Sequence, residues 1–284
     1  MTEILRLAAF TDIPEGGNPA GVVLDATALD DAAMQTIAAD IGYSETAFLT
    51  RVGADRTYDV RYFSPAAEVP FCGHATIATA VALAQRNGAG NIVLNTKAGP
   101  VAVRTQADGK AITATLSSVT PHLAPPPTDD ELAPALTALR WSVADLDPDL
   151  PPRIAYAGAH HLILPARTRA RLADLDYDFD ALKSYMSEHD LVTVDLVFRD
   201  DTTTFHARNP FPVGGVVEDP ATGAAAAAFG AYLRALELVT PPARVTIHQG
   251  DDMGRPSLLL VDLDAGDGAI HVTGQAVRIP KDMA

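Results

Sequence analysis

The sequence predicts an α+β protein made of two similar domains, each a mostly antiparallel sheet wrapped around a central helix. Two observations favour this class. The order of elements repeats, because a strand, a proline-rich loop and a glycine-led helix rich in alanine follow one another at 57–87 and again at 203–236. The two helices also consist largely of Ala, Gly and Thr, small residues that let surrounding strands approach closely.

The first half of the chain contains the first copy of this pattern. Clusters of Gly, Pro and Asn mark its turns, and apolar spacing marks its helices. We expect helices at 30–41 and 73–86, and strands at 4–10, 20–24, 46–51, 57–63, 91–96 and 99–105. The proline-rich segment 117–136 is expected to link the domains before an acidic helix start.

The second half repeats the first in element order. "RIAYAGAHHLILPA" (153–166) is a strand, a glycine turn and a strand, and a helix at 178–188 corresponds to the helix at 30–41. We therefore expect an N-terminal domain over 1–118 and a C-terminal domain over 125–269. A last strand at about 270–284 is expected to return to the first domain.

Composition excludes several classes of function. The chain has 284 residues, of which 48% are hydrophobic, as in a globular protein. A net charge of −15 argues against a nucleic-acid partner. No apolar stretch reaches the ~18 residues of a membrane span, and the charged start is unlike a signal peptide. One cysteine allows no internal disulfide, so we expect a cytoplasmic protein.

The starts of the two small-residue helices are candidate binding sites. We expect the helices at 73–84 and 223–234 to be buried in the core. The first N–H groups of a helix have no acceptor within it, and glycine leaves room for an anion beside them. The sequences "CGHAT" and "PATGAA" would thus present two sites for a carboxylate, across one cleft if the two domains face each other.

Five motifs carry a resemblance to a known family. "GGNPAGVVL", "IGYSETAFL", "YFSPAAEVPFCGHATIATA", "VEDPATGAAAAAFGAYL" and "IHQGDDMGRPS" occur in that order over nearly the whole chain. They resemble the motifs of the PhzF-like phenazine-biosynthesis family, which shares the two-domain fold of diaminopimelate epimerase. The resemblance implies a cofactor-free isomerase that moves a proton on a substrate such as trans-2,3-dihydro-3-hydroxyanthranilate, and it suggests a homodimer.

The resemblance also implies catalytic residues. The family's catalytic glutamate corresponds to Glu45, its histidine to His74 and its second carboxylate to Asp219. The apolar neighbours of Glu45 would raise its pKa toward the range that a proton shuttle needs. Taken without the family, Glu45 is a solvated residue, while His74 and Asp219 are candidate caps of the helices that follow them.

Substrate binding is expected from the first turn and from the two helix starts. The family pattern and the free N–H groups together indicate Asn18, Gly73, Thr222, Gly223 and Ala224. Asn18 has an alternative role in stabilising its own turn. Arg255 is left open between solvent, the other domain and the substrate. Glu68 and Glu218 are interpreted as solvated or structural.

Cysteine chemistry and bound cofactors are not indicated. Epimerases and racemases of this fold invert a carbon with two cysteines, whereas Cys72 is the only cysteine here. We interpret Cys72 as a small buried residue, and a nucleophilic Cys72–His74 pair is the weaker alternative. The histidine spacings match no metal motif, and no nucleotide-binding glycine loop is present. We expect neither a metal nor a cofactor.

Three functions remain open at this point. The leading hypothesis is a cofactor-free isomerase of a small carboxylate-bearing molecule, with Glu45 as general acid and base. A one-base epimerase or racemase is the second. A non-catalytic binding or scaffold protein is the third, because a fold alone does not guarantee activity.

Overall fold

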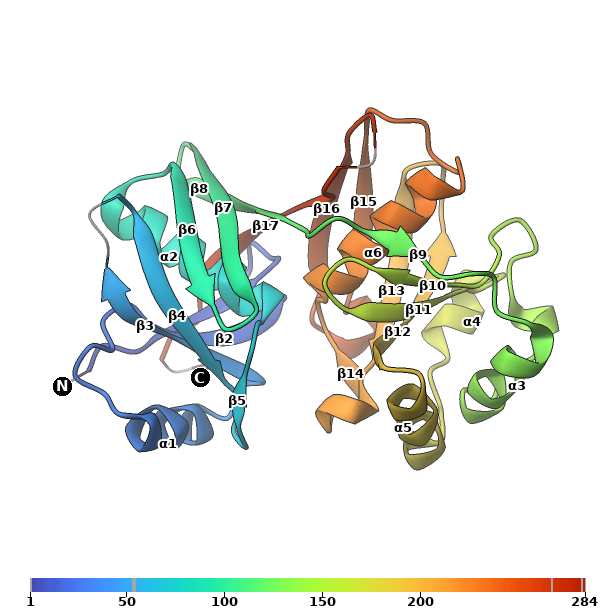
Figure 1. Cartoon of the computed structure of the whole chain (residues 1–284), viewed down its shortest axis with the longest axis horizontal. Helices are drawn as coiled ribbons and strands as arrows, with labels where there is room; N and C mark the ends of the chain where they lie inside the picture. The colour runs from blue at the N-terminus through green and yellow to red at the C-terminus, as the bar shows by residue number, and fades with distance from the viewer. Residues whose placement is uncertain (1, 53–54, 267, 282, 284) are drawn as a thin grey trace. The chain divides into compact units, whose positions relative to one another are not determined.

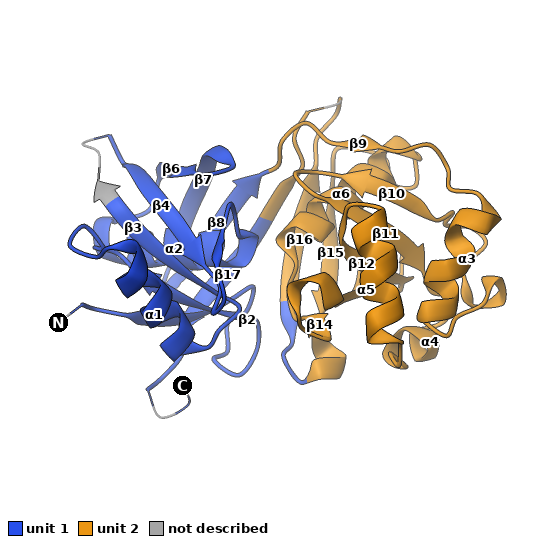
Figure 2. Cartoon of the chain, turned by 60° about the horizontal axis from the view of Figure 1, so that its bottom comes forward, with its two compact units in different colours: residues 1–117, 254–257, 273–284 blue, residues 118–253, 258–272 orange. Residues whose placement is uncertain are grey.

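The computed structural model describes residues 2–52, 55–266, 268–281 and 283. It is a mixed α+β structure with six α-helices among the described residues. The chain divides into two compact units, coloured separately in Figure 2. Unit 1 comprises residues 1–117, 254–257 and 273–284, and unit 2 comprises residues 118–253 and 258–272.

Unit 1 is built around one buried helix. Its elements are β1 (Leu5–Ala9), β2 (Asn18–Val23), α1 (Asp31–Ile41), β3 (Glu45–Val52), β4 (Thr57–Phe63), β5 (Glu68–Val69), α2 (Gly73–Asn87), β6 (Asn91–Thr96), β7 (Gly99–Asp108), β8 (Ala111–Ser117) and most of β17 (His271–Arg278). Helix α2 packs against β1, β2, β3, β7 and β8 (Figure 1). All its residues from 74 to 84 are buried, which confirms the predicted core helix.

Most strand pairs of unit 1 are antiparallel. Strands β1 and β2, β3 and β4, β6 and β7, and β7 and β8 pair in this way, as do β1 and the end of β17. The pairs β2–β3 and β4–β6 are parallel, because a helix connects the two strands in each case. Helix α1 packs on β3 and β4 through Met34 and Ala38, and Asp30 caps its start.

Unit 2 has a second buried helix. Its elements are β9 (His122–Leu123), α3 (Asp129–Ala138), η1 (Val143–Asp145), β10 (Arg153–Tyr156), β11 (His160–Pro165), α4 (Arg169–Ala173), α5 (Phe179–Glu188), β12 (Leu191–Arg199), β13 (Thr204–Pro210), η2 (Pro212–Gly214), β14 (Glu218–Asp219), α6 (Gly223–Ala235), β15 (Ala243–Gln249), η3 (Asp251–Met253) and most of β16 (Ser257–Leu263), where η denotes a 3₁₀ helix. Helix α6 is buried along almost its whole length, as predicted, and packs against β9, β10, β11 and β12.

Two segments differ from the sequence analysis. The proline-rich stretch that was expected to be a linker contains β9, which pairs with β10, and Thr128 caps α3 within the same stretch. From Ser118 onward this stretch is part of unit 2. Residues 254–257 were assigned to the second domain by sequence, but they lie in unit 1, where they contact the loop before β2.

Candidate active site

Glu45 is the first residue of β3 in unit 1. Helix α1 ends at Ile41, and the left-handed backbone of the following residue Gly42 (φ 72°) turns the chain toward this strand. Residue 45 is paired with Ala20 in the parallel β2–β3 ladder. The Glu45 side chain is only 17% exposed, so the interpretation of Glu45 as a solvated surface residue is wrong.

Cys72 and His74 lie at the start of α2. Cys72 is the N-cap residue in extended conformation, its side chain makes no capping hydrogen bond, and His74 is the second helical residue. Thr76 Oγ1 donates to the Cys72 carbonyl at 2.7 Å and accepts from the buried Tyr62 hydroxyl at 2.7 Å. The helix start is thereby fixed, and His74 is buried instead of capping the helix with its side chain.

Three side chains converge at this point of unit 1. Glu45 Oε2 lies 3.4 Å from His74 Nε2, and the Cys72 thiol donates to Glu45 Oε2 at 3.5 Å. Ser44 Oγ is 3.3 Å from the same His74 nitrogen. The fold thus brings the predicted Glu45 and His74 into direct contact, although they are far apart in sequence.

Burial controls the protonation of Glu45. Desolvation raises the pKa of its carboxyl group, and hydrogen bonds from Ser44 and Cys72 oppose this rise only in part. The direction agrees with the sequence analysis. A carboxyl group with a raised pKa gives up and takes back a proton more readily near neutral pH than an ordinary surface glutamate does.

Cys72 is not aimed at a nitrogen of His74. Its sulfur lies 3.4 Å from Nδ1 and 3.8 Å from Nε2. Such similar distances place the sulfur over the face of the imidazole ring, out of line with the lone pair or N–H bond of either nitrogen. A thiol activated by histidine needs an in-line hydrogen bond, so the geometry does not favour a nucleophilic pair.

The same cluster is the one place in the described residues where three potential metal-ligating groups meet. One ligand atom each of Glu45, Cys72 and His74 lies within 4.8 Å of the others. Zinc accepts a carboxylate, thiolate and imidazole together, but it requires the nitrogen lone pair to point at the ion. An ion in line with the lone pair of a His74 nitrogen would lie in the plane of the ring, whereas the Cys72 sulfur lies over the ring face. The present side-chain positions therefore do not match a zinc site.

Asn18 begins β2 and is buried, directly after the turn of Gly16 and Gly17. Gly17 has a left-handed backbone (φ 64°), and a Cβ atom there would lie 2.3 Å from the Ala9 carbonyl oxygen. Arg255 binds this turn. Its Nε donates to the Gly17 carbonyl and its Nη2 to the Gly16 carbonyl, both at 2.7 Å.

Asp219 and Thr222 form a second polar group, in unit 2. Asp219 ends β14, and Thr222 Oγ1 donates to its Oδ2 at 2.6 Å. Thr222 is the N-cap residue of α6, so the alternative role of Asp219 as the helix cap is wrong. Gly223 and Ala224 are the first two residues of the helix, as predicted.

Gln249 organises this turn and was not singled out by the sequence analysis. Its Oε1 accepts from the Thr222 N–H at 3.0 Å. Its Nε2 donates to the Asp219 carbonyl at 2.8 Å and to Thr222 Oγ1 at 3.0 Å. Gln249 is 2% exposed, and the only signal for it was its place in "IHQGDDMGRPS". The Thr222 N–H therefore already has an acceptor in Gln249, and this hydrogen bond helps to fix the start of α6.

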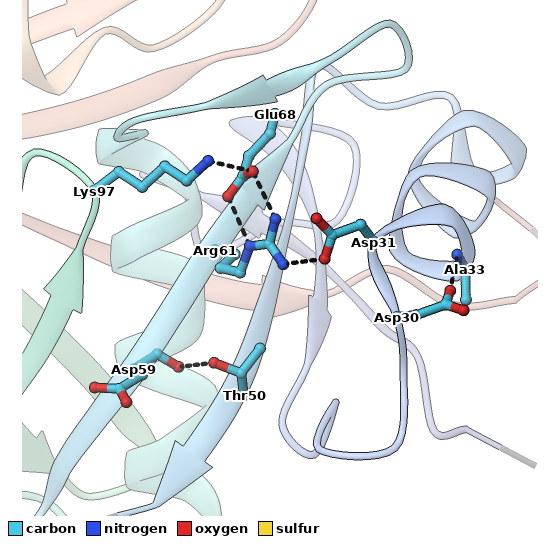
Figure 3. Close-up of polar contacts among 8 residues, drawn as sticks. All are labelled: Asp30, Asp31, Ala33, Thr50, Asp59, Arg61, Glu68 and Lys97. Atoms are coloured by element: carbon cyan, nitrogen blue, oxygen red, sulfur yellow. Dashed lines mark hydrogen bonds and ion pairs between the residues drawn. The ribbon is translucent and has the colours of Figure 1, made fainter.

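An arginine–glutamate pair fixes the loop before each central helix. In unit 1, Arg61 Nε and Nη2 donate to the two oxygens of Glu68, each at 2.7 Å (Figure 3). In unit 2, Arg208 Nε and Nη2 bind Glu218 in the same manner, at 2.9 and 2.5 Å. Both pairs join a strand to the two-residue strand that precedes the helix, so Glu68 and Glu218 are structural.

Strand register shows which positions of the two units correspond. Arg61 is paired with Phe48 in unit 1, and Arg208 with Leu196 in unit 2. Phe48 and Leu196 therefore occupy corresponding positions in the two units. The residues three positions before them, Glu45 and Thr193, correspond as well. Aligning the helix starts at Gly73 and Gly223 matches Cys72 with Thr222 and His74 with Ala224. The acid and the imidazole therefore occur in unit 1, with neutral residues at the corresponding places in unit 2.

Solved structures share this fold. The chain resembles a predicted epimerase from Pseudomonas aeruginosa with a TM-score of 0.87 and 29% identity, covering 99% of this chain and 98% of that one. A hydroxyproline epimerase from Agrobacterium vitis matches with a TM-score of 0.65 and 14% identity, covering 97% and 90%. The fold is therefore the diaminopimelate epimerase-like α+β fold.

Sequence comparison gives the class of enzyme and then the family. The uncharacterized isomerase YddE of Escherichia coli K12 is 32% identical over 97% of this chain and 95% of its own length. The trans-2,3-dihydro-3-hydroxyanthranilate isomerase of Pseudomonas fluorescens is 32% identical over 91% and 89%. The protein is an isomerase. A model of the phenazine biosynthesis-like proteins matches residues 7–281, and the chain belongs to this PhzC–PhzF family.

None of the helices in the described part of the chain combines the length and the apolar character needed to cross a membrane.

Proposed function

We propose that this protein is a cofactor-free isomerase that moves a proton on a small carboxylate-bearing molecule, with Glu45 as general acid and base. One observation carries the proposal. The Glu45 carboxyl group is largely buried and lies 3.4 Å from His74 Nε2 at the start of a buried helix. General acid–base catalysis needs such a positioned group, and the raised pKa of Glu45 suits it to the task.

The roles of the other groups follow from their contacts. His74 is held close to both Glu45 and Ser44, so it orients the carboxyl group and stabilises the charge on it after the proton leaves. Asp219 is our second candidate acid. It accepts from the Thr222 hydroxyl, which orients one carboxyl oxygen beside the start of α6.

Substrate binding is assigned to the loop residue Asn18 and to the two helix starts. The N–H groups of Gly73, Gly223 and Ala224 lie in the first turns of α2 and α6, where no acceptor exists within the helix. Such N–H groups favour a carboxylate or a developing oxyanion. The Thr222 N–H already donates to Gln249, which leaves those of Gly223 and Ala224 for the substrate.

The first substrate to test is trans-2,3-dihydro-3-hydroxyanthranilate. The relative from Pseudomonas fluorescens is named for this isomerisation and matches along 91% of this chain. A one-base epimerase is the second candidate, because the solved structure from Pseudomonas aeruginosa at 29% identity is described as a predicted epimerase. In both reactions Glu45 is the proposed group that removes and returns the proton.

The test follows the proton. The protein is incubated with trans-2,3-dihydro-3-hydroxyanthranilate in deuterated water, and product and recovered substrate are analysed by NMR. Isomerisation shifts the double bonds, whereas epimerisation changes the configuration without shifting them. The Glu45→Gln variant should do neither, and Glu188→Gln, which removes an exposed carboxylate at the end of α5, is the matched control. Undiminished turnover by Glu45→Gln would end the proposal.

A further inference from the structure

Arg255 is a partly buried cation that pairs with no carboxylate in the part of the chain that the structure describes. Its two hydrogen bonds go to the backbone carbonyls of Gly16 and Gly17. A guanidinium group has five N–H donors, so these bonds leave three of them for another acceptor. Among the residues that the structure describes, none forms an ion pair with Arg255.

Two arginines on the strands that lead toward the central helices are neutralised by carboxylates. Arg61 is paired with Glu68 and Asp31, and Arg208 with Glu218. For Arg255, by contrast, desolvation lowers the pKa, and an electrostatic interaction with Tyr43 opposes this effect. A partly buried charge with no counterion among the described residues is the kind of group that an anionic ligand satisfies.

The position of Arg255 connects it with the candidate site of unit 1. The carbonyls that it binds belong to the two residues directly before Asn18. Tyr43, its electrostatic neighbour, lies two residues before Glu45. The guanidinium group is thus held next to the loop that presents Asn18 and near the chain segment that presents Glu45.

We propose that Arg255 binds the carboxylate of the substrate. The planar guanidinium group matches a carboxylate with two parallel charge-assisted hydrogen bonds, and its bonds to Gly16 and Gly17 orient it in advance. This proposal rests on the proposed function, in which the substrate carries a carboxylate. It adds that the enzyme selects ionised acids over neutral amides, and that Arg255 determines this preference.

A purely structural role for Arg255 makes a different prediction. The same turn is held by other bonds, since the Gly16 N–H donates to Ile13 and the Gly17 N–H to Pro256. If Arg255 only clamped the turn, its loss would weaken the binding of an acid and of the corresponding amide to the same extent. If Arg255 binds the carboxylate, its loss weakens the binding of the acid and leaves the binding of the amide unchanged.

The experiment measures this difference directly. Binding of 3-hydroxyanthranilate and 3-hydroxyanthranilamide, and of trans-4-hydroxyproline and its amide, is measured by calorimetry. None of these pairs requires turnover. We expect the wild type to prefer the acid of at least one pair by about ten- to a hundredfold, the range of a hydrogen bond to a charged group. Arg255→Gln should remove this preference, and Arg255→Lys, which keeps the charge without the planar fork, should keep part of it.

Two further variants complete the design. Arg104→Gln removes an exposed positive charge on β7 and should retain the full acid preference, which controls for net charge. Glu45→Gln should also retain it, so a failure of the acid–base proposal is distinguishable from a failure of this one. Equal affinity of the wild type for acids and amides, no binding of either acid, or an equal loss for both ligands in Arg255→Gln would contradict the role of Arg255.

Discussion

The Glu45 carboxyl oxygen lies 3.4 Å from His74 Nε2, although 28 residues separate the two in the chain. Two short-range features produce this contact. Gly42 turns the chain out of α1 into β3, and Gly73 starts α2 directly after an extended Cys72. Each feature is local, but their meeting depends on the packing of α2 against β3.

Replacement of Glu45 by glutamine should abolish most turnover and leave the fold intact. Glutamine keeps the size of the side chain but cannot transfer the proton, and general acid–base catalysis contributes about 10²–10⁴-fold. The rate of isomerisation is compared with that of Glu188→Gln, and circular dichroism checks the fold. A variant within a few-fold of the wild-type rate would show that another group moves the proton.

Replacement of Cys72 by serine should cost less than about tenfold in rate. The sulfur lies over the imidazole face, and the chain has no second cysteine to complete a two-thiol mechanism. A serine hydroxyl also retains the donor that Cys72 directs at Glu45. Complete loss of activity in a correctly folded Cys72→Ser variant would instead indicate covalent catalysis.

Local sequence patterns predicted the elements of the fold well. Helices α2 and α6 and the strands beside them begin and end within a few residues of their expected positions. Apolar spacing and glycine turns predict such elements because they depend only on residues close together in the sequence. Burial also raises the pKa of Glu45, which is the direction that the sequence analysis predicted.

Long-range contacts were less accessible from sequence. Gln249 reaches Thr222 across 27 residues, and Arg255 reaches Gly17 across 238. Such contacts depend on strand register and chain path, which single-residue preferences do not encode. The N-cap of α6 was misassigned for a related reason, because Asp219 pairs in β14 with β13 and the helix starts four residues later.

The ion pair of unit 2 should matter more for stability than that of unit 1. The Arg208 and Glu218 side chains are 10% and 4% exposed, whereas those of Arg61 and Glu68 are 24% and 14% exposed. Glu218→Gln leaves a buried guanidinium group without its counterion, which costs about 3–5 kcal/mol. In the Glu68→Gln variant, by contrast, Arg61 keeps its ion pair with Asp31. The urea midpoint should therefore fall further for Glu218→Gln, and equal shifts would contradict this argument.

The family resemblance also predicts a homodimer. Light scattering over a range of protein concentrations measures the molar mass in solution. A mass near twice that of the chain is the expected result. A monomer that persists at every concentration would remove this prediction without affecting the assignment of Glu45.

A buried chain of hydrogen bonds in unit 2 predicts an unusual dependence of stability on pH. Thr193 donates to Asn209 at 2.7 Å, so its hydroxyl oxygen accepts from His161 Nδ1 at 2.8 Å. Asn209 in turn donates to Asp195 at 3.0 Å. Burial lowers the pKa of His161 to about 3 and raises the pKa of Asp195 to about 7. Both groups are thus neutral in the folded protein at pH 5.

Between about pH 4 and pH 6.5, these two pKa shifts have opposite effects on the pH dependence of the free energy of unfolding. In this window the folded state binds one proton on Asp195, and the unfolded state binds one on His161, so the pair contributes little pH dependence. The Asp195→Asn variant lacks the proton that the folded state binds on Asp195. The unfolded state then binds more protons, and the free energy of unfolding should fall as the pH drops from 6.5 toward 3, by at most about 1.4 kcal/mol per pH unit.

His161→Gln should have the opposite effect, because Asp195 alone binds a proton in the folded state. Its stability should rise as the pH drops from 7 toward 4. Urea denaturation of both variants and the wild type at pH 7.5 and pH 5 measures the three slopes. If Asp195→Asn and His161→Gln shift stability with pH in the same direction, the two buried groups do not carry the protons as argued, and other residues set the pH dependence.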